Sequence, residues 1–216
     1  MEEKEIYFKN LMPHQIEEQS FKIINQILGD RVFNKKKEPV IKRVIHATAD
    51  FSFSDTLKFS DNAVDCAIEA LKNGADILTD TNMVKAGINK KLAEKFNVKI
   101  YCYMDDPEIA ENAEKRKITR AAVCMEKSVL LNKNLIVAVG NAPTALLKLA
   151  ELIDKNIINP ALIIAVPVGF VNVIESKELI ITKNIQYIVN TGRKGGSTVA
   201  AAIVNSLLKI CDSNCR

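Results

Sequence analysis

The chain has 216 residues, of which 48% are hydrophobic and 26% are charged, and its formal net charge at pH 7 is +4. This length suits a single domain, residues 1–216, that buries roughly 70% of the surface of its unfolded chain. The mild charge and the absence of Trp argue against nucleic-acid binding, and the longest apolar runs fall short of the ~20 residues that span a bilayer.

The first sixty residues are predicted to be helical. Pro13 suits the first turn of a helix that ends near Gly29, and Ser20 interrupts the apolar stripe of that helix. The Ser20 hydroxyl can bond back to the carbonyl four residues earlier. It can also provide a polar contact where the helix borders a pocket. A second helix is predicted over residues 38–48.

This second helix carries His46, one of two histidines in the chain. At about 100° per residue, one face of the helix carries its apolar stripe: Val40, Ile41, Val44, Ile45 and Thr48. Arg43, His46 and Asp50 fall on the opposite face. The segment alone describes a surface histidine. A histidine is also the side chain that exchanges a proton most readily near neutral pH, so His46 is a candidate acid–base residue.

From residue 61 onward, predicted helices and strands alternate. The strands cover residues 75–79, 99–104, 135–139, 161–166 and 185–189. The helices cover residues 61–73, a stretch interrupted at Gly87, 107–131 with a break, 143–154, 172–179 and 197–209. Because each strand is short and is followed by a helix, the strands should form a parallel sheet covered on both faces. We predict a three-layer, flavodoxin-like α/β fold with a five-stranded parallel sheet and extra N-terminal helices.

Ligands bind beyond the carboxyl ends of the strands in such a sheet. Asp80 follows the first predicted strand within a run of small polar residues, and Asn141 and Thr144 follow the third. Residues 167–172 follow the fourth strand. We therefore expect these loops to face a ligand.

The loop after the fifth strand has the strongest local pattern. Its candidate ligand-binding residues are Gly192, Arg193, Lys194, Gly195, Gly196 and Ser197. Three glycines, two basic side chains and the start of a helix together predict an anion-binding cradle. The order of residues differs from a Walker A loop, and a phosphate and a carboxylate both fit the cradle. The same residues can also form an ordinary helix cap with two solvated basic side chains.

Other kinds of site are poorly supported by the sequence. No catalytic triad can be assembled, and the five cysteines show no CxxC spacing, so neither a metal site nor a disulfide framework is expected. The N-terminal residues lack the layout of a signal peptide, and a cytoplasmic protein is expected. One histidine together with several anion-binding loops favours proton-assisted rearrangement of a polycarboxylate over hydrolysis.

Six stretches of the chain, in order, resemble the precorrin-8X methylmutase family. They are residues 16–21, 43–51, 80–88, 140–146, 167–177 and 192–198. The similarity runs from about Pro13 to Leu208. Each stretch alone is weak evidence, but six in order, with loops where the fold needs a ligand, make a specific match.

This resemblance implies a flavodoxin-like homodimer that acts on a corrinoid polycarboxylate without an external cofactor. The implied reaction moves a methyl group from C-11 to C-12 of the macrocycle and gives hydrogenobyrinate or cobyrinate in cobalamin biosynthesis. His46 falls on the family's proton donor and acceptor, and Ser20 and Arg43 fall on its substrate-contacting serine and arginine. The other binding residues are expected from loop placement. The sequence leaves open whether the substrate already contains cobalt.

Two other functions remain as alternatives. A tetrapyrrole carrier would hold a corrin without turnover and would use His46 for packing or axial ligation. A nucleotide-binding regulatory domain would rest on the glycine-rich loop alone.

Overall fold

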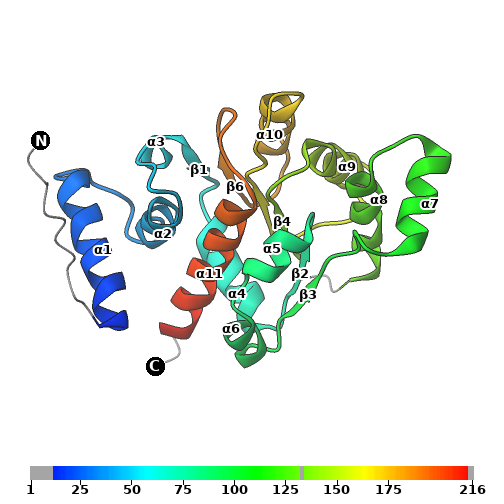
Figure 1. Ribbon diagram of the computed structural model, residues 1–216. Helices are drawn as coiled ribbons and strands as arrows, with labels where there is room; N and C mark the ends of the chain where they lie inside the picture. Colours follow the sequence, from blue (N-terminus) through cyan, green and yellow to red (C-terminus); the bar gives the residue numbers. More distant parts are fainter. Residues whose placement is uncertain (1–11, 132–133, 214–216) are drawn as a thin grey trace, which may run out of the picture. The chain divides into compact units, whose positions relative to one another are not determined.

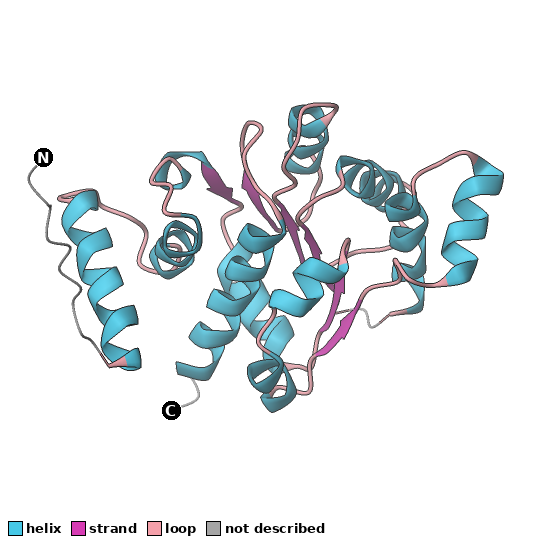
Figure 2. Cartoon of the chain, viewed as in Figure 1, coloured by secondary structure: helices cyan, strands magenta, loops and turns pink. Residues whose placement is uncertain are grey.

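The computed structural model describes residues 12–131 and 134–213 (Figures 1 and 2). The chain divides into two compact units, residues Met1–Val32 and Phe33–Arg216. The described part of the first unit contains one helix, α1 (Pro13–Leu28), which begins at a proline and ends before Gly29 at a φ of 58°. This helix matches the sequence prediction closely. A single domain over residues 1–216 stays a prediction.

The second unit is built on one mixed sheet of six strands. They are β1 (Leu57–Phe59), β2 (Asp76–Thr79), β3 (Lys99–Tyr101), β4 (Ile136–Val139), β5 (Leu162–Ala165) and β6 (Tyr187–Asn190). Their order across the sheet is β1-β6-β5-β4-β2-β3. Strands β2 to β6 pair in parallel, whereas β1 pairs antiparallel with β6 and forms one edge.

The strand β1 corrects the predicted five-stranded sheet, because its residues were expected to be helical. Three residues are too few to reveal a period, so the strand is defined by its partner rather than by its own pattern. Leu57 lies opposite Asn190, and the N–H of Thr191 donates to the carbonyl of Thr56 at 2.9 Å. Tertiary pairing therefore converts the end of a helical segment into an edge strand.

Helices cover both faces of this sheet (Figure 1). The helices of this unit are α2 (Glu38–Thr48), α3 (Phe53–Thr56), α4 (Ala63–Lys72), α5 (Asn82–Gly87), α6 (Lys90–Lys95), α7 (Pro107–Arg116), α8 (Arg120–Glu126), the 3-10 helix η1 (Lys127–Leu130), α9 (Pro143–Asp154), α10 (Val173–Ile181) and α11 (Ser197–Ser213). On one face, α11 packs on β4 and β5 and is flanked by α2, α4 and α5. On the other, α9 contacts β4, α10 contacts β6, and α8 packs on α9.

The core lies between these layers. Every residue of β2, β4 and β5 is buried, as expected for parallel strands covered on both faces. The α11 helix is apolar around most of its circumference because α2, α4, α5 and the sheet enclose it. No helix of the described residues is long and apolar enough to cross a membrane.

Candidate functional site

The helix α2 turns His46 away from the core. Val40, Ile41, Val44 and Ile45 are buried, whereas Arg43 is half-buried and His46 is exposed. This confirms the two faces predicted from the sequence. His46 lies in the last turn, which ends at Ala49 in a left-handed conformation, with its N–H bonded to the carbonyl of Ile45 at 2.7 Å. The chain therefore turns sharply just after the histidine.

The residues that follow this turn bind the glycine-rich loop between β6 and α11. The Lys194 Nζ donates to Asp50 Oδ2 at 2.7 Å and to Ser52 Oγ at 3.0 Å. These bonds, with the Ser52 N–H on the other carboxylate oxygen, lower the pKa of Asp50 to about 2. Lys194, predicted as a ligand-binding residue, thus fastens its loop to the segment that begins four residues after His46. His46 and the glycine-rich loop therefore both lie near the carboxyl ends of the strands.

A second set of contacts joins the glycine-rich loop to the loop between β5 and α10. The N–H of Gly196 donates to the carbonyl of Val166 at 2.8 Å, and that of Gly169 donates to the carbonyl of Arg193 at 3.2 Å. The Arg193 guanidinium donates to the carbonyl of Phe170 at 2.7 Å and lies 5.9 Å from the centre of its ring. Phe170 is 83% exposed. A large, exposed apolar side chain and a cation therefore lie side by side in these loops.

Close approach explains two of the glycines at this edge. A Cβ on Gly195 would lie 2.1 Å from the carbonyl oxygen of Val166, and a Cβ on Gly140 would lie 2.7 Å from the Cα of Ser197. Gly195 also has a φ of +154°, which side-chain-bearing residues rarely adopt. The three loops that follow β4, β5 and β6 thus touch one another through backbone atoms.

Asp80 was predicted to contact a ligand, but the structure gives it a different role. The side chain is fully buried, and its carboxylate accepts from the N–H groups of Gly140 at 3.0 Å, Asn141 at 2.7 Å and Ala142 at 2.7 Å. Burial raises the pKa of this carboxyl, and the three donors oppose that rise. Because its oxygens face the protein backbone, Asp80 holds the loop after β4 and does not point toward a ligand.

Three other predicted binding residues have distinct surroundings. Asn141 is exposed at the carboxyl end of β4. The hydroxyl of Ser197 is bonded to that of Thr81 at 3.2 Å, which ties the start of α11 to the loop after β2. The hydroxyl of Thr144 is bonded instead to that of Thr119 at 2.7 Å, beside the start of α8. Thr144 therefore links the start of α9 to the start of α8, besides lying next to the loop after β4.

Ser20 lies on α1, in the first unit of the chain. Its hydroxyl donates to the carbonyl of Ile16 at 2.8 Å. This is the local bond that the sequence offered as the first of two readings, and the substrate contact expected from the family resemblance stays a prediction.

Two buried residues beneath the glycine-rich loop were not predicted. The Lys177 Nζ donates to the carbonyls of Gly192 and Lys194, each at 2.8 Å, and the Asn190 amide donates to the same Lys194 carbonyl at 2.8 Å. Burial lowers the pKa of Lys177 to about 8. The signal was present in the sequence, because Lys177 falls in the i, i+3, i+4, i+7 stripe that also holds Val173 and Ile180 and that the helix buries.

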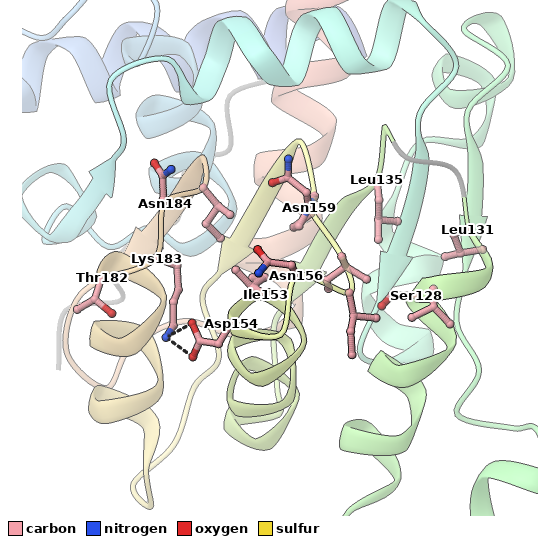
Figure 3. A pocket seen from close by; sticks show the side chains of 15 residues that line it. Ser128, Leu131, Leu135, Ile153, Asp154, Asn156, Asn159, Thr182, Lys183 and Asn184 are labelled. Atoms are coloured by element: carbon pink, nitrogen blue, oxygen red, sulfur yellow. Dashed lines mark hydrogen bonds and ion pairs between the residues drawn. The ribbon is translucent and has the colours of Figure 1, made fainter.

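A cavity of about 970 Å³ lies at the opposite side of the sheet, at the amino ends of the strands (Figure 3). Leu135, Pro160 and Ile185, which precede β4, β5 and β6, line it together with the ion pair of Lys183 and Asp154 at 2.6 Å. None of the predicted site residues lines this cavity. Within residues 12–131 and 134–213, no group of three or more His, Cys, Asp or Glu side chains is arranged to hold a metal ion.

Comparisons with known proteins identify the family to which the chain is similar. The family model of precorrin-8X methylmutase matches residues 15–210. The cobalt-precorrin-8 methylmutase of Leptospira interrogans is 43% identical over 202 residues, which cover 89% of this chain and 91% of the relative. That of Priestia megaterium is 39% identical over 203 residues, which cover 94% of this chain and 90% of the relative.

A solved structure shows the same likeness in three dimensions. The precorrin-8X methylmutase of Thermus thermophilus superposes with a TM-score of 0.84 at 37% identity, covering 92% of this chain and 98% of that one. The chain therefore belongs to the precorrin-8X methylmutase family, a family of methyl-shifting isomerases.

Proposed function

We propose that this protein moves a methyl group from C-11 to C-12 of a precorrin-8-type macrocycle in cobalamin biosynthesis, with His46 as proton donor and acceptor. The observation that carries the proposal is the place of His46. It is exposed at the end of α2, next to the segment that Lys194 fastens to the glycine-rich loop. Family membership supplies the reaction, and this edge of the sheet offers the site for it.

The chemical role of His46 follows from the ring that it would face. Protonating the conjugated macrocycle lowers its electron density and assists migration of the methyl group, and returning the proton to the imidazole fixes the tautomer of the product. General acid–base assistance of this kind contributes about 10²–10⁴-fold to a rate. Arg43, one turn earlier on the same face of α2, is suited to a peripheral carboxylate. Ser20 is proposed as a further substrate contact.

The remaining peripheral acids are assigned to the glycine-rich loop. Arg193 is exposed, and within the described residues one of its N–H groups donates to the Phe170 carbonyl, so the guanidinium keeps donors for a carboxylate. The first N–H groups of α11, at Ser197 and beyond, have no partner within their own helix. Gly196 contributes through its shape, since its N–H is used by Val166. The exposed Asn141 offers a side-chain amide from the neighbouring loop.

Several properties of the whole protein belong to the same proposal. We class the parallel strands as flavodoxin-like, because the order β6-β5-β4-β2-β3 reproduces the 2-1-3-4-5 pattern when the parallel strands are numbered along the chain. We infer a homodimer that works in the cytoplasm as one domain and needs no cofactor. The relatives named cobalt-precorrin-8 methylmutase support a substrate that already carries cobalt.

The decisive experiment follows the absorption change of methyl migration with metal-free and cobalt-bearing substrates. His46→Ala should lower kcat by about 10²-fold or more while the corrinoid still binds. His14→Ala, at the chain's other histidine, is the matched control and should keep the wild-type rate. Full migration by His46→Ala would overturn the acid–base role. A wild-type protein that binds the product tightly without turnover would favour the carrier function instead.

A further inference from the structure

Lys177 carries its charge on the buried face of a helix. It is 1% exposed, and it shares the buried stripe of α10 with Val173, Ser176 and Ile180. Within the described residues no carboxylate pairs with it, and burial alone accounts for its shifted pKa. An unpaired buried charge is costly, and an apolar residue of similar size would avoid that cost. The fold has therefore accommodated this ammonium in spite of its unfavourable burial.

The contacts of the ammonium are backbone carbonyls of a single loop. Nζ bonds the carbonyls of Gly192 and Lys194, and the buried Asn190 amide adds a second bond to the latter. Asn190 is itself fixed, because its Oδ1 accepts from the Thr56 hydroxyl at 2.6 Å. The loop is thus held from below at two alternate peptide units.

These two bonds decide where the neighbouring N–H groups point. All described peptide bonds are trans, and in a trans unit the C=O and the following N–H point in opposite directions. With the carbonyls of Gly192 and Lys194 aimed inward at Lys177, the N–H groups of Arg193 and Gly195 are aimed away from it. In the described part of the chain neither N–H donates to another residue. Two such N–H groups, aimed outward from one loop, can both donate to a single anion.

We propose that Lys177 is a positioning residue of the methylmutase reaction, which presents the N–H groups of Arg193 and Gly195 to one peripheral carboxylate of the corrinoid substrate. The inference rests on the proposed function, because it needs the glycine-rich loop to bind substrate. The Arg193 guanidinium and the start of α11 lie beside these amides, so the carboxylate meets charge and hydrogen-bond donors together. Lys177 does not touch the substrate and acts through the loop.

The test compares kcat and KM for methyl migration in the wild type and in Lys177→Met. The variant should raise KM by about ten- to hundredfold, the effect of losing one or two hydrogen bonds to a charged group, and should leave kcat nearly unchanged because His46 is intact. Lys183→Met is the matched control: Lys183 follows α10, is also largely buried, and pairs with Asp154 at the opposite edge of the sheet. Its KM should stay at the wild-type value.

A purely structural role for Lys177 gives a different result. Lys177→Met would then melt at a lower temperature while its folded fraction kept the wild-type KM, and that outcome overturns the inference. A wild-type protein without turnover would overturn the proposed function first, so the two failures are distinguishable. Where Lys177→Met does not fold, Lys177→Gln takes its place in the kinetic comparison, because it keeps hydrogen-bond donors without the charge. Hydrogen exchange of the wild type then decides: the unbonded N–H groups of Arg193 and Gly195 should exchange fast in the free protein and slowly once the corrinoid substrate is bound, and exchange rates that the substrate leaves unchanged refute the inference.

Discussion

The Asp80 carboxylate should be the main support of the loop after β4, and Asp80→Asn tests this with the smallest change of shape. The carboxylate accepts three backbone N–H groups at 2.7–3.0 Å in a fully buried site. A carboxamide has one oxygen, so its NH₂ group must face at least one of these donors. That donor loses its partner, and the other bonds lose the assistance of the negative charge.

The expected loss of stability can be worked out from these contacts. Leaving one buried N–H unpaired costs about 1–3 kcal/mol, and the loss of charge assistance at the other bonds adds to this. Removing a buried charge returns part of the sum, as the raised pKa of Asp80 indicates. We expect a net loss of about 2–3 kcal/mol, which lowers Tm by about 4–12 °C in a protein of this length. Methyl migration should fall as well, because Gly140 in this loop lies against Ser197.

Thermal and urea unfolding, followed by circular dichroism, measure the effect. Asp61→Asn is the control, because Asp61 is exposed in the turn before α4 and should unfold within about 0.5 kcal/mol of the wild type. An Asp80→Asn protein as stable as this control would refute the reasoning, since it would show that the loop holds its shape without the carboxylate.

Two further predictions follow from the glycine-rich loop. Gly195→Ala should lose about 2–4 kcal/mol of unfolding free energy in urea, because its Cβ would meet the Val166 carbonyl. Gly192→Ala is the control: its φ is +75° but no atom lies near the added Cβ, so it should lose only about 1 kcal/mol. Equal losses would rule out the contact as the cause. The pKa of Lys177 is lowered from 10.5 to about 8, so the native state releases this proton first. The unfolded chain then binds more protons between pH 8 and 10.5, and wild-type stability should rise with pH across that window relative to Lys177→Met; parallel curves would contradict the shift.

The predicted fold is confirmed where the local pattern and the tertiary structure agree. Each predicted strand from residue 75 onward forms within a few residues of its expected place, because a buried parallel strand needs a continuous apolar run that the sequence displays. The edge strand β1 was missed, because an antiparallel edge of three residues takes its structure from β6. Local periodicity cannot reveal such a strand.

The candidate site divides along a similar line. The sequence placed His46 on the polar face of α2 and placed the loops at the carboxyl ends of the strands, since both follow from periodicity and from strand direction. It could not tell which polar loop residues face outward. Asp80 and Lys194 were both expected to meet a ligand; Asp80 is buried, whereas Lys194 is exposed and bonded to Asp50. The partners of Asp80 are 60 or more residues away along the chain, and Asp50, the partner of Lys194, is 144 residues away.

The two buried charges at this edge have opposite effects on the loops that they hold. Asp80 draws the N–H groups of Asn141 and Ala142 inward, so the carbonyls of the same peptide units, at Gly140 and Asn141, turn outward. Lys177 draws carbonyls inward and turns N–H groups outward. If the glycine-rich loop binds a substrate carboxylate as proposed, the outward carbonyls after β4 disfavour the anion and the outward N–H groups after β6 favour it. On the same proposal, the exposed Asn141 side chain offers a donor from the loop after β4, whereas the loop after β6 offers backbone N–H groups as well as Arg193.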